Sequence, residues 1–282
     1  MRNKILYLHT EDLNFFYRLN RELIRKNVRF KILGGVSKIP DLRAILLTTL
    51  KDTHSLKGSY KKLKIMAYDE KDNFNHYVYK ILAAYRIGYK EFYSDLIFSI
   101  DPGSKKIGMV VFLDDYYLIS HTFYDKSGII NLVKDYVNCF QTNNPNPLRI
   151  TFKFGSGVLP IPLKLIEAIS DFFQERNHLK VFLINESKSS KVKIQNVKKK
   201  FKTKHELSAL ILAMRNGIEI NFSNNLETYK KFKAQDSNYA METKNIGKHY
   251  DNSISFQDLV EKILKNEISL SESSELLHKN NK

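Results

Sequence analysis

The sequence contains a single cysteine, Cys139, among 282 residues. One thiol cannot form an intramolecular disulfide, and it cannot supply a zinc site that is built from several cysteines. Cys139 lies in the apolar run IINLVKDYVNCF, which predicts a helix, so we interpret it as a core residue. Disulfide-stabilised and multi-cysteine zinc domains are therefore excluded.

Long hydrophobic runs are missing as well. No stretch approaches the roughly 18–20 uncharged apolar residues that a membrane helix needs. The N-terminus MRNKILYLHTEDL reaches acidic residues before it can form the apolar core of a signal peptide. We therefore expect a cytoplasmic protein without a membrane partner. Glycine-rich nucleotide-binding fingerprints do not occur either, because neither GxGxxG nor GxxxxGK(S/T) is found.

Acidic residues are a minority among the charged residues. The chain has 30 Asp and Glu against 46 Lys and Arg, which gives a net charge of +16 at pH 7. A surplus of this size favours polyanions, because lysine and arginine neutralise phosphates and release counterions. We expect a nucleic acid as partner, DNA rather than RNA. The alternative is a lysine- and asparagine-rich proteome, which yields basic proteins without such a partner.

Hydrophobic residues make up 43% of the chain, which is enough for two packed domains. In the first, KILYLHT predicts a buried strand, EDLNFFYRLNRELIRKN an amphipathic helix and VRFKILGG the next strand. DLRAILLTTL and KKLKIMAYDE predict further strands, and NFNHYVYKILAAYRIG a helix. We assign residues 1–94 to a small doubly wound α/β domain that is Rossmann- or receiver-like.

Acidic residues follow two of these strands, where open α/β sheets often bind ligands. They allow a metal or phosphoacceptor pocket in a regulatory sensor, but helix capping and the helix dipole already account for acids at helix N-termini. We favour the capping interpretation. The residues concerned are His9, Glu11, Asp12, Asp69 and Glu70.

The pattern changes near residue 95. DLIFSIDPGSKKIGMVVFLDDYYLISHTFYD contains three apolar strands separated by the turns GSKK and DDYY, which predicts an antiparallel meander. The helix SGIINLVKDYVNCFQ, the strand RITFKFG, a helix from about Pro160 to Arg176 and the strand LKVFLIN follow. The order is βββαβαβ and then a further helix, and we assign residues 95–222 to this second domain.

This order, with Asp101 in the first strand, resembles the RNase H-like superfamily, and FSIDPGSKKIGMVVF is similar to the opening of RuvC and YqgF resolvase-type nucleases. FKFGSGVLP resembles the fourth strand of the YqgF group, LINESKSSK its fifth strand and KHELSALILAMRNG its final helix. The resemblance implies an RNase H-like mixed β-sheet with flanking helices. DxG after an apolar strand also opens actin-like ATPases and sugar kinases, but these need two such domains.

Carried onto this sequence, the resemblance implies a catalytic metal site. Asp101 would be the first ligand and Glu186 the second, and His205 or Glu206 would supply the third from the last helix. Two divalent cations about 3.5–4 Å apart activate water and stabilise the leaving oxygen, and hard oxygen ligands suit Mg²⁺ or Mn²⁺. The alternatives are that Asp101 only forms the turn DPGS and that Glu186 is a surface residue.

Two positions depart from the pattern of such enzymes. Some RuvC-type resolvases have a carboxylate on the fourth strand, where this chain has Lys153. The last helix of such enzymes usually carries an acid three residues after the first ligand, but Ser208 follows His205 here. Glu206 lies about 100° around the helix from His205, so the two side chains cannot both point straight into one site. The metal site is therefore either atypical or inactive.

A lysine-rich segment joins the second proposed ligand to the third. Its positive charge would bind a phosphate backbone that enters the site, and Phe201 would be available to stack on a base. The alternative is that the segment forms a solvated loop. The backbone of Gly155 and Gly157 would bind a phosphate at a helix N-terminus, or else form a tight turn. The lysines are Lys188, Lys191, Lys193, Lys198, Lys199, Lys200, Lys202 and Lys204.

We assign residues 223–282 to a helical C-terminal extension, in which SFQDLVEKILKNEISLSESSELLHKNN predicts two short helices. They resemble part of a helix-turn-helix, but a third helix is absent, so we expect them to pack against the body or a partner chain instead of reading DNA. For the whole chain we expect a metal-dependent endonuclease of the RuvC/YqgF-like type, a phosphodiester hydrolase that acts on branched or structured nucleic acid such as a Holliday junction. A symmetric junction would require a homodimer. The alternative is a catalytically impaired RNase H-like subunit that binds nucleic acid or serves as a scaffold.

Overall fold

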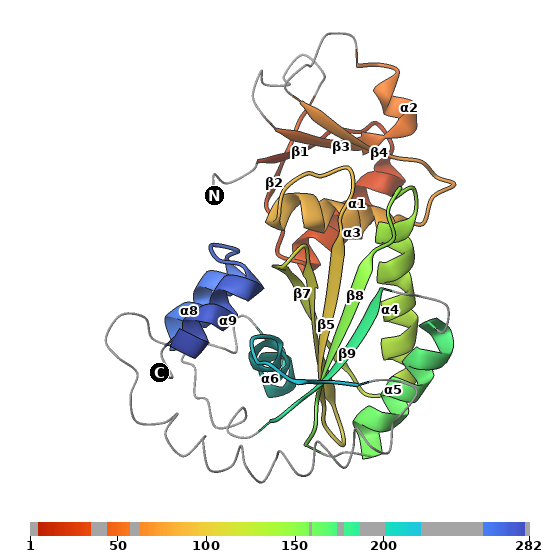
Figure 1. Cartoon of the computed structure of the whole chain (residues 1–282). Helices are drawn as coiled ribbons and strands as arrows, with labels where there is room; N and C mark the ends of the chain where they lie inside the picture. The colour runs from red at the N-terminus through yellow and green to blue at the C-terminus, as the bar shows by residue number, and fades with distance from the viewer. Residues whose placement is uncertain are drawn as a thin grey trace. The chain divides into compact units, whose positions relative to one another are not determined.

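The computed structural model describes residues 5–34, 44–56, 63–157, 160–173, 178–186, 201–220 and 256–279. The chain falls into two compact units, Met1–Glu91 and Phe92–Lys282 (Figure 1). The first contains a parallel sheet and the second a mixed sheet, and helices flank both. The predicted α/β fold class is therefore confirmed.

The first unit is a doubly wound α/β domain. Its strands are all parallel and lie in the order β2-β1-β3-β4, which the sequence pattern did not reveal. β2 lies on one side of β1, and β3 and β4 lie on the other. Its elements are β1 (Leu6–Leu8), α1 (Leu13–Arg25), β2 (Phe30–Ile32), β3 (Ile45–Thr49), α2 (Leu50–Thr53), β4 (Lys64–Tyr68) and α3 (Phe74–Arg86).

The acidic residues that follow β1 and β4 have local partners. Asp12 is the N-cap of α1 and accepts a hydrogen bond from the backbone N–H of Phe15 at 3.0 Å. Asp69 accepts one from the backbone N–H of Lys71 at 3.0 Å. The first contact is the bond that a helix N-cap makes, as the capping interpretation expects, whereas the N-cap of the helix after β4 is Asn73 and not Asp69.

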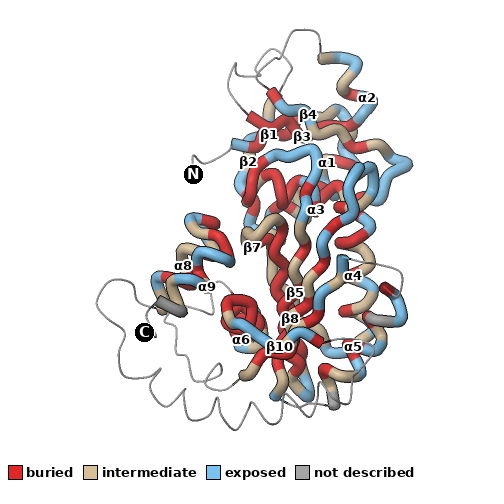
Figure 2. The backbone as a smooth tube through the Cα atoms, in the orientation of Figure 1, coloured by how far each residue is buried: buried red, intermediate tan, exposed pale blue. Residues whose placement is uncertain are grey.

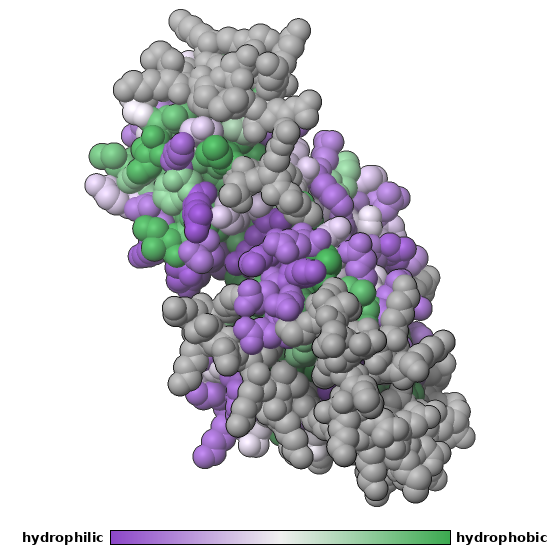
Figure 3. All heavy atoms as spheres, turned by 90° about the vertical axis from the view of Figure 1, so that its left-hand side faces the viewer, coloured by the Kyte–Doolittle hydropathy of each residue, from purple (hydrophilic) through white to green (hydrophobic). Residues whose placement is uncertain are grey.

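Apolar side chains also lie at the surface of the first unit. The space-filling view of Figure 3 shows part of this surface. Leu13, Tyr17 and Ile24 of α1 are 67%, 67% and 65% exposed. Their spacing puts them on one stripe of the helix, whereas Phe15 and Leu19 face the core. This stripe is thus separate from the packing that forms the unit.

The second unit is built on a six-stranded sheet in the order β10-β9-β8-β5-β6-β7. β5, β6 and β7 form the predicted antiparallel meander, and β8 and β9 run parallel to β5. This is the RNase H-like arrangement. The elements are β5 (Asp95–Pro102), β6 (Ile107–Leu113), β7 (Tyr116–Phe123), α4 (Lys126–Gln141), β8 (Arg149–Gly155), α5 (Pro160–Phe173), β9 (Leu179–Ile184), α6 (Lys204–Ala213), β10 (Ile218–Glu219), α8 (Phe256–Leu264) and α9 (Leu270–Lys279).

Helices cover both faces of this sheet. α4 and α5 lie on one side and α6 on the other (Figure 1). Phe98 and Phe152 stack with ring centroids 5.1 Å apart in the core, and Cys139 of α4 is buried as expected. Residues 206–213 of α6 are buried without interruption (Figure 2). α6 is therefore an internal helix, although an amphipathic helix at the surface would bury only one stripe.

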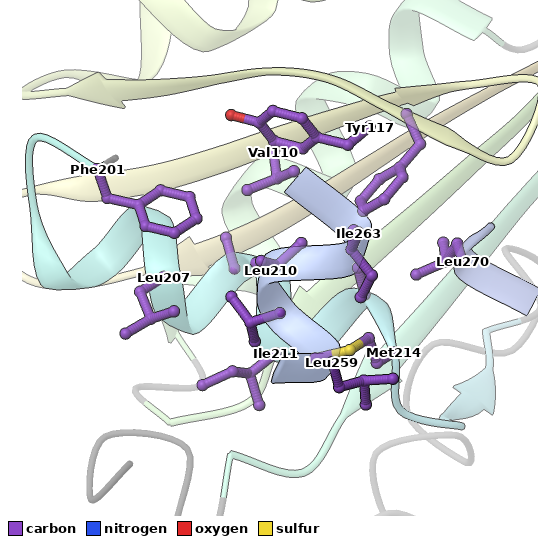
Figure 4. Close-up of a cluster of buried hydrophobic side chains, with 14 residues drawn as sticks. Val110, Tyr117, Phe201, Leu207, Leu210, Ile211, Met214, Leu259, Ile263 and Leu270 are labelled. Carbon is purple, nitrogen blue, oxygen red and sulfur yellow. The ribbon is translucent and has the colours of Figure 1, made fainter. Parts of the chain in front are cut away.

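The C-terminal helices α8 and α9 explain this burial. Leu259 and Ile263 of α8 and Leu270 of α9 share one hydrophobic cluster with α6 and β7 (Figure 4). The backbone N–H of Leu270 donates to the carbonyl oxygen of Asp115 at 2.8 Å, and the Asn266 amide to that of Tyr117 at 3.0 Å. The two helices therefore pack against the body of the unit, as their sequence predicts.

None of the helices in the described ranges is both long and apolar enough to cross a membrane.

Candidate active site

Three residues on neighbouring strands of the meander form a row under α6. Asp101 of β5 pairs with Gly108 of β6, and Gly108 pairs with Thr122 of β7. Paired residues in antiparallel strands lie on the same face of the sheet. The first turn of α6 rests on this row, because a Cβ at Gly108 would overlap with the backbone carbonyl group of His205. The missing side chain thus lets α6 approach the strands closely.

Asp101 is buried under α6 and is held by two side chains of that helix. Nδ1 of His205 lies 2.7 Å from Oδ2 of Asp101, and with an ionised carboxylate this nitrogen donates the proton. The Ser208 side chain, one turn further along α6, also hydrogen bonds to Asp101. Burial raises the pKa of Asp101, although the hydrogen bond and charge of His205 act against this shift. Ser208, at the position of the expected acid, therefore stabilises the carboxylate instead.

Glu186 follows β9 and brings a second carboxylate to the same end of the sheet. A Cβ at Gly155 or Gly157 would overlap with a carboxylate oxygen of Glu186, so both glycines provide the space for this side chain. Burial raises the pKa of Glu186, the backbone N–H of Gly157 lowers it, and the negative charge of Asp101 raises it further. The two carboxylates therefore interact electrostatically.

The predicted phosphate-binding glycines thus have a different neighbour. The backbone N–H of Gly157 hydrogen bonds to the Glu186 carboxylate. A phosphate would have to share this N–H with the Glu186 carboxylate or displace the carboxylate from it. Phosphate binding by Gly155 and Gly157 stays a prediction.

Glu206 is buried, but it faces β7 instead of Asp101. Ser120 donates a hydrogen bond to its carboxylate at 2.7 Å and Thr122 donates one at 2.5 Å. The backbone N–H of Lys202 adds a third at 3.1 Å. Of the two candidates for a third ligand on α6, only His205 contacts Asp101. Their separation by about 100° around the helix explains the difference.

The opposite end of α6 is held by one basic residue. Lys153 of β8 donates hydrogen bonds to the carbonyl oxygens of Ala213 at 2.5 Å and Arg215 at 3.0 Å. A cation is favourable there because carbonyl groups at a helix C-terminus lack partners and carry partial negative charge. Burial lowers the pKa of Lys153 to about 8. The lysine at the position of a resolvase carboxylate therefore anchors α6.

Two of the eight predicted nucleic-acid-binding lysines lie in the described ranges. Lys202 and Lys204 are exposed next to the N-terminus of α6, and the charge of Lys204 lowers the pKa of Asp101. The other six, Lys188, Lys191, Lys193, Lys198, Lys199 and Lys200, lie outside the described residues.

The proposed base-stacking role of Phe201 is not supported, because this side chain is 4% exposed and belongs to the hydrophobic cluster under α8. Sequence reasoning passed over a different aromatic residue. Tyr124, directly after β7, is 73% exposed, and Nζ of Lys106 lies 5.6 Å from the centre of its ring. The predicted meander could have identified this pair, because its strand register brings Lys106 next to Tyr124.

Asp101 and Glu186 fit a divalent cation chemically. Two partly buried carboxylates that repel each other offer the hard oxygen ligands that Mg²⁺ and Mn²⁺ prefer. His205 is bound to Asp101 through Nδ1, so in this arrangement it orients the carboxylate. Within the described ranges, no three His, Cys, Asp or Glu side chains are grouped to hold a metal ion.

Comparisons with known proteins add little to this geometry. No known protein family and no curated protein matches the chain. Among solved structures, Aquifex aeolicus Argonaute shares 10% identity at a TM-score of 0.24, over 64% of this chain and 35% of that one. The same Argonaute with externally bound siRNA shares 12% identity at a TM-score of 0.22, over 64% and 34% of the two chains.

An exopolyphosphatase from Cytophaga hutchinsonii shares 12% identity at a TM-score of 0.15, over 58% of this chain and 55% of that one. The chain therefore spans about a third of the Argonaute length and about half of the exopolyphosphatase. Similarities this weak support no conclusion about the fold or the function of this chain. The RNase H-like assignment rests on the strand order and directions of the second unit.

Proposed function

We propose that the second unit is a metal-dependent endonuclease of the RuvC/YqgF-like type that hydrolyses phosphodiester bonds in branched or structured nucleic acid. The observation that carries the proposal is the convergence of Asp101 and Glu186. These residues are far apart in the sequence, and the negative charge of the first raises the pKa of the second. A pair of like charges is costly unless a cation binds between them.

In this proposal Asp101 and Glu186 hold Mg²⁺ or Mn²⁺. The bound metal would activate water and stabilise the leaving oxygen. The chain's own residues orient the ligands. His205 and Ser208 fix the Asp101 carboxylate, and Gly155 and Gly157 leave room for Glu186. Lys202 and Lys204 supply positive charge beside the site for a phosphate backbone.

Cleavage of labelled four-way junctions, flaps and single strands, made of DNA and of RNA, tests this proposal with Mg²⁺, Mn²⁺ or EDTA. We expect metal-dependent cleavage by the natural chain and none by Asp101→Asn. Asp95→Asn is the matched control, because Asp95 lies at the other end of β5 and pairs with Arg149 at 2.6 Å. Equal cleavage by Asp101→Asn and the natural chain would reject the proposal.

A second candidate, a nucleic-acid-binding or scaffold subunit of the same fold, is favoured by the hydrogen bonds that Asp101 already makes. His205 and Ser208 satisfy this carboxylate within the protein, and Ser208 lies where such enzymes usually carry an acid. Salt-sensitive binding without cleavage by any substrate and metal, together with equal binding by Asp101→Asn, would identify this function.

A further inference from the structure

We propose that Tyr124 and Lys106 form a platform on which one unpaired base of a single-stranded nucleic acid stacks while its backbone passes the Asp101 site. The inference deepens the proposed function and rests on it for the identity of the ligand. Its own support comes from the exposure of Tyr124 and from its contact with Lys106, which neither the predicted metal site nor the lysine-rich segment uses.

The strand register puts the platform at the same end of the sheet as Asp101. Lys106 lies two residues before Gly108, and Tyr124 lies two residues after its partner Thr122. Both residues lie one position beyond the last pair of β6 and β7, Ile107 and Phe123, so they are at the end of the meander that carries Asp101 and the first turn of α6. The contact between Nζ of Lys106 and the Tyr124 ring, at 5.6 Å, agrees with this placement.

The chemistry of the pair matches a nucleotide. A tyrosine ring that is 73% exposed gives nothing to the core, yet its flat face suits stacking on any base. The neighbouring ammonium group binds a phosphate and, through its contact with the ring, limits the ring's movement. Lys105, Lys202 and Lys204 are also exposed around this end of the sheet. These lysines supply the positive charge that a phosphate backbone requires.

The spacing between platform and site suits a short single strand. β5 and β7 are separated by two strand spacings, which is about 10 Å. A base in a duplex is already stacked and paired, so its face is not available to Tyr124. An unpaired base at a branch point or in a single strand presents that face. We therefore assign the platform to unpaired nucleotides.

The test measures binding without cleavage, by fluorescence anisotropy in EDTA with labelled oligo(dT) and with an abasic oligomer of equal length and charge. Tyr124→Ala should weaken oligo(dT) binding by roughly 5- to 150-fold and leave abasic binding unchanged, whereas Tyr124→Phe should bind like the natural chain. Lys106→Met should weaken both and lower the slope of log affinity against log salt by about 0.7, as the loss of one phosphate contact predicts.

The matched control is Tyr89→Ala. Tyr89 belongs to the first unit, is 40% exposed and has Nζ of Lys64 at 5.7 Å from its ring centre. It should not change either affinity. The inference is overturned if Tyr124→Ala binds oligo(dT) like the natural chain, if it loses both oligomers equally, or if the natural chain binds neither.

Cleavage assays separate this inference from the proposed function. Tyr124-dependent binding without metal-dependent cleavage would uphold the platform and reject the endonuclease. Metal-dependent cleavage by a chain whose binding ignores Tyr124 would uphold the endonuclease and reject the platform.

Discussion

His205 and Glu206 are adjacent on α6, yet they bind different strands of the meander. His205 contacts Asp101 of β5, whereas Glu206 accepts hydrogen bonds from Ser120 and Thr122 of β7. The peptide group that joins them lies over Gly108 of β6. One ligand candidate thus faces the carboxylate site, and the other ties α6 to the sheet.

Gly108→Ala should destabilise the second unit. The added methyl group would overlap with the backbone of His205, and backbone atoms cannot move aside as the end of a flexible side chain can. We expect the free energy of unfolding to fall by about 3 kcal/mol. Urea denaturation measures it, with Gly34→Ala as control because nothing lies within 4 Å of that position. Equal stability of the two variants would contradict the close approach of α6.

Glu206→Gln should reduce stability without removing metal dependence. The amide replaces one of two carboxylate oxygens, so one of the three donors around Glu206 loses its acceptor. The expected loss is about 1–3 kcal/mol. Glu186→Gln should instead weaken the metal dependence of cleavage. Urea denaturation and metal titration of cleavage distinguish the two residues, and the opposite outcome would place Glu206 in the metal site.

Gly155→Ala should displace Glu186. A Cβ there would overlap with the Glu186 carboxylate, which would turn away from Asp101. For the loss of a group that orients a metal ligand, we expect metal affinity to fall about 10- to 100-fold. Isothermal titration with Mn²⁺ measures it. Unchanged affinity would show that Glu186 does not bind the metal in its present position.

Lys153 should make stability depend on pH above neutrality. Its pKa is about 8 in the folded protein and 10.5 when solvated, so the unfolded chain binds more protons between these values. Stability from this group therefore rises with pH from about 8 to 10.5, by at most about 3 kcal/mol. Urea denaturation across this range should show the rise in the natural chain and a flatter profile in Lys153→Met. Parallel profiles would contradict the burial of the charge.

Ile263→Ala should test whether α8 is part of the folded unit. Ile263 is fully buried in the cluster with α6, so its truncation should cost about 2–5 kcal/mol. Ile24→Ala, at a position that is 65% exposed, should change stability by less than about 0.5 kcal/mol. A cost for Ile263→Ala as small as that of Ile24→Ala would mean that α8 does not stabilise α6.

Local sequence patterns were sufficient for most elements of the fold. The apolar runs and the turns GSKK and DDYY located β5, β6 and β7, and RITFKFG coincides with β8. These features depend on neighbours in the chain, which the sequence displays directly. The strand order of the first unit was beyond this reasoning, because pairing between parallel strands depends on crossovers and leaves no local signal.

The candidate site divides in the same way. Asp101, Glu186 and His205 were selected from the sequence because the segments that contain them resemble those of RuvC- and YqgF-type nucleases. The sequence did not show the hydrogen-bond partners of Ser208 and Glu206. It also did not show that Phe201 is buried and Tyr124 exposed. These properties depend on which sides of α6 and β7 face the sheet, α8 and solvent. Contacts between residues so distant in the chain arise only when the elements pack, and packing decides which polar groups meet.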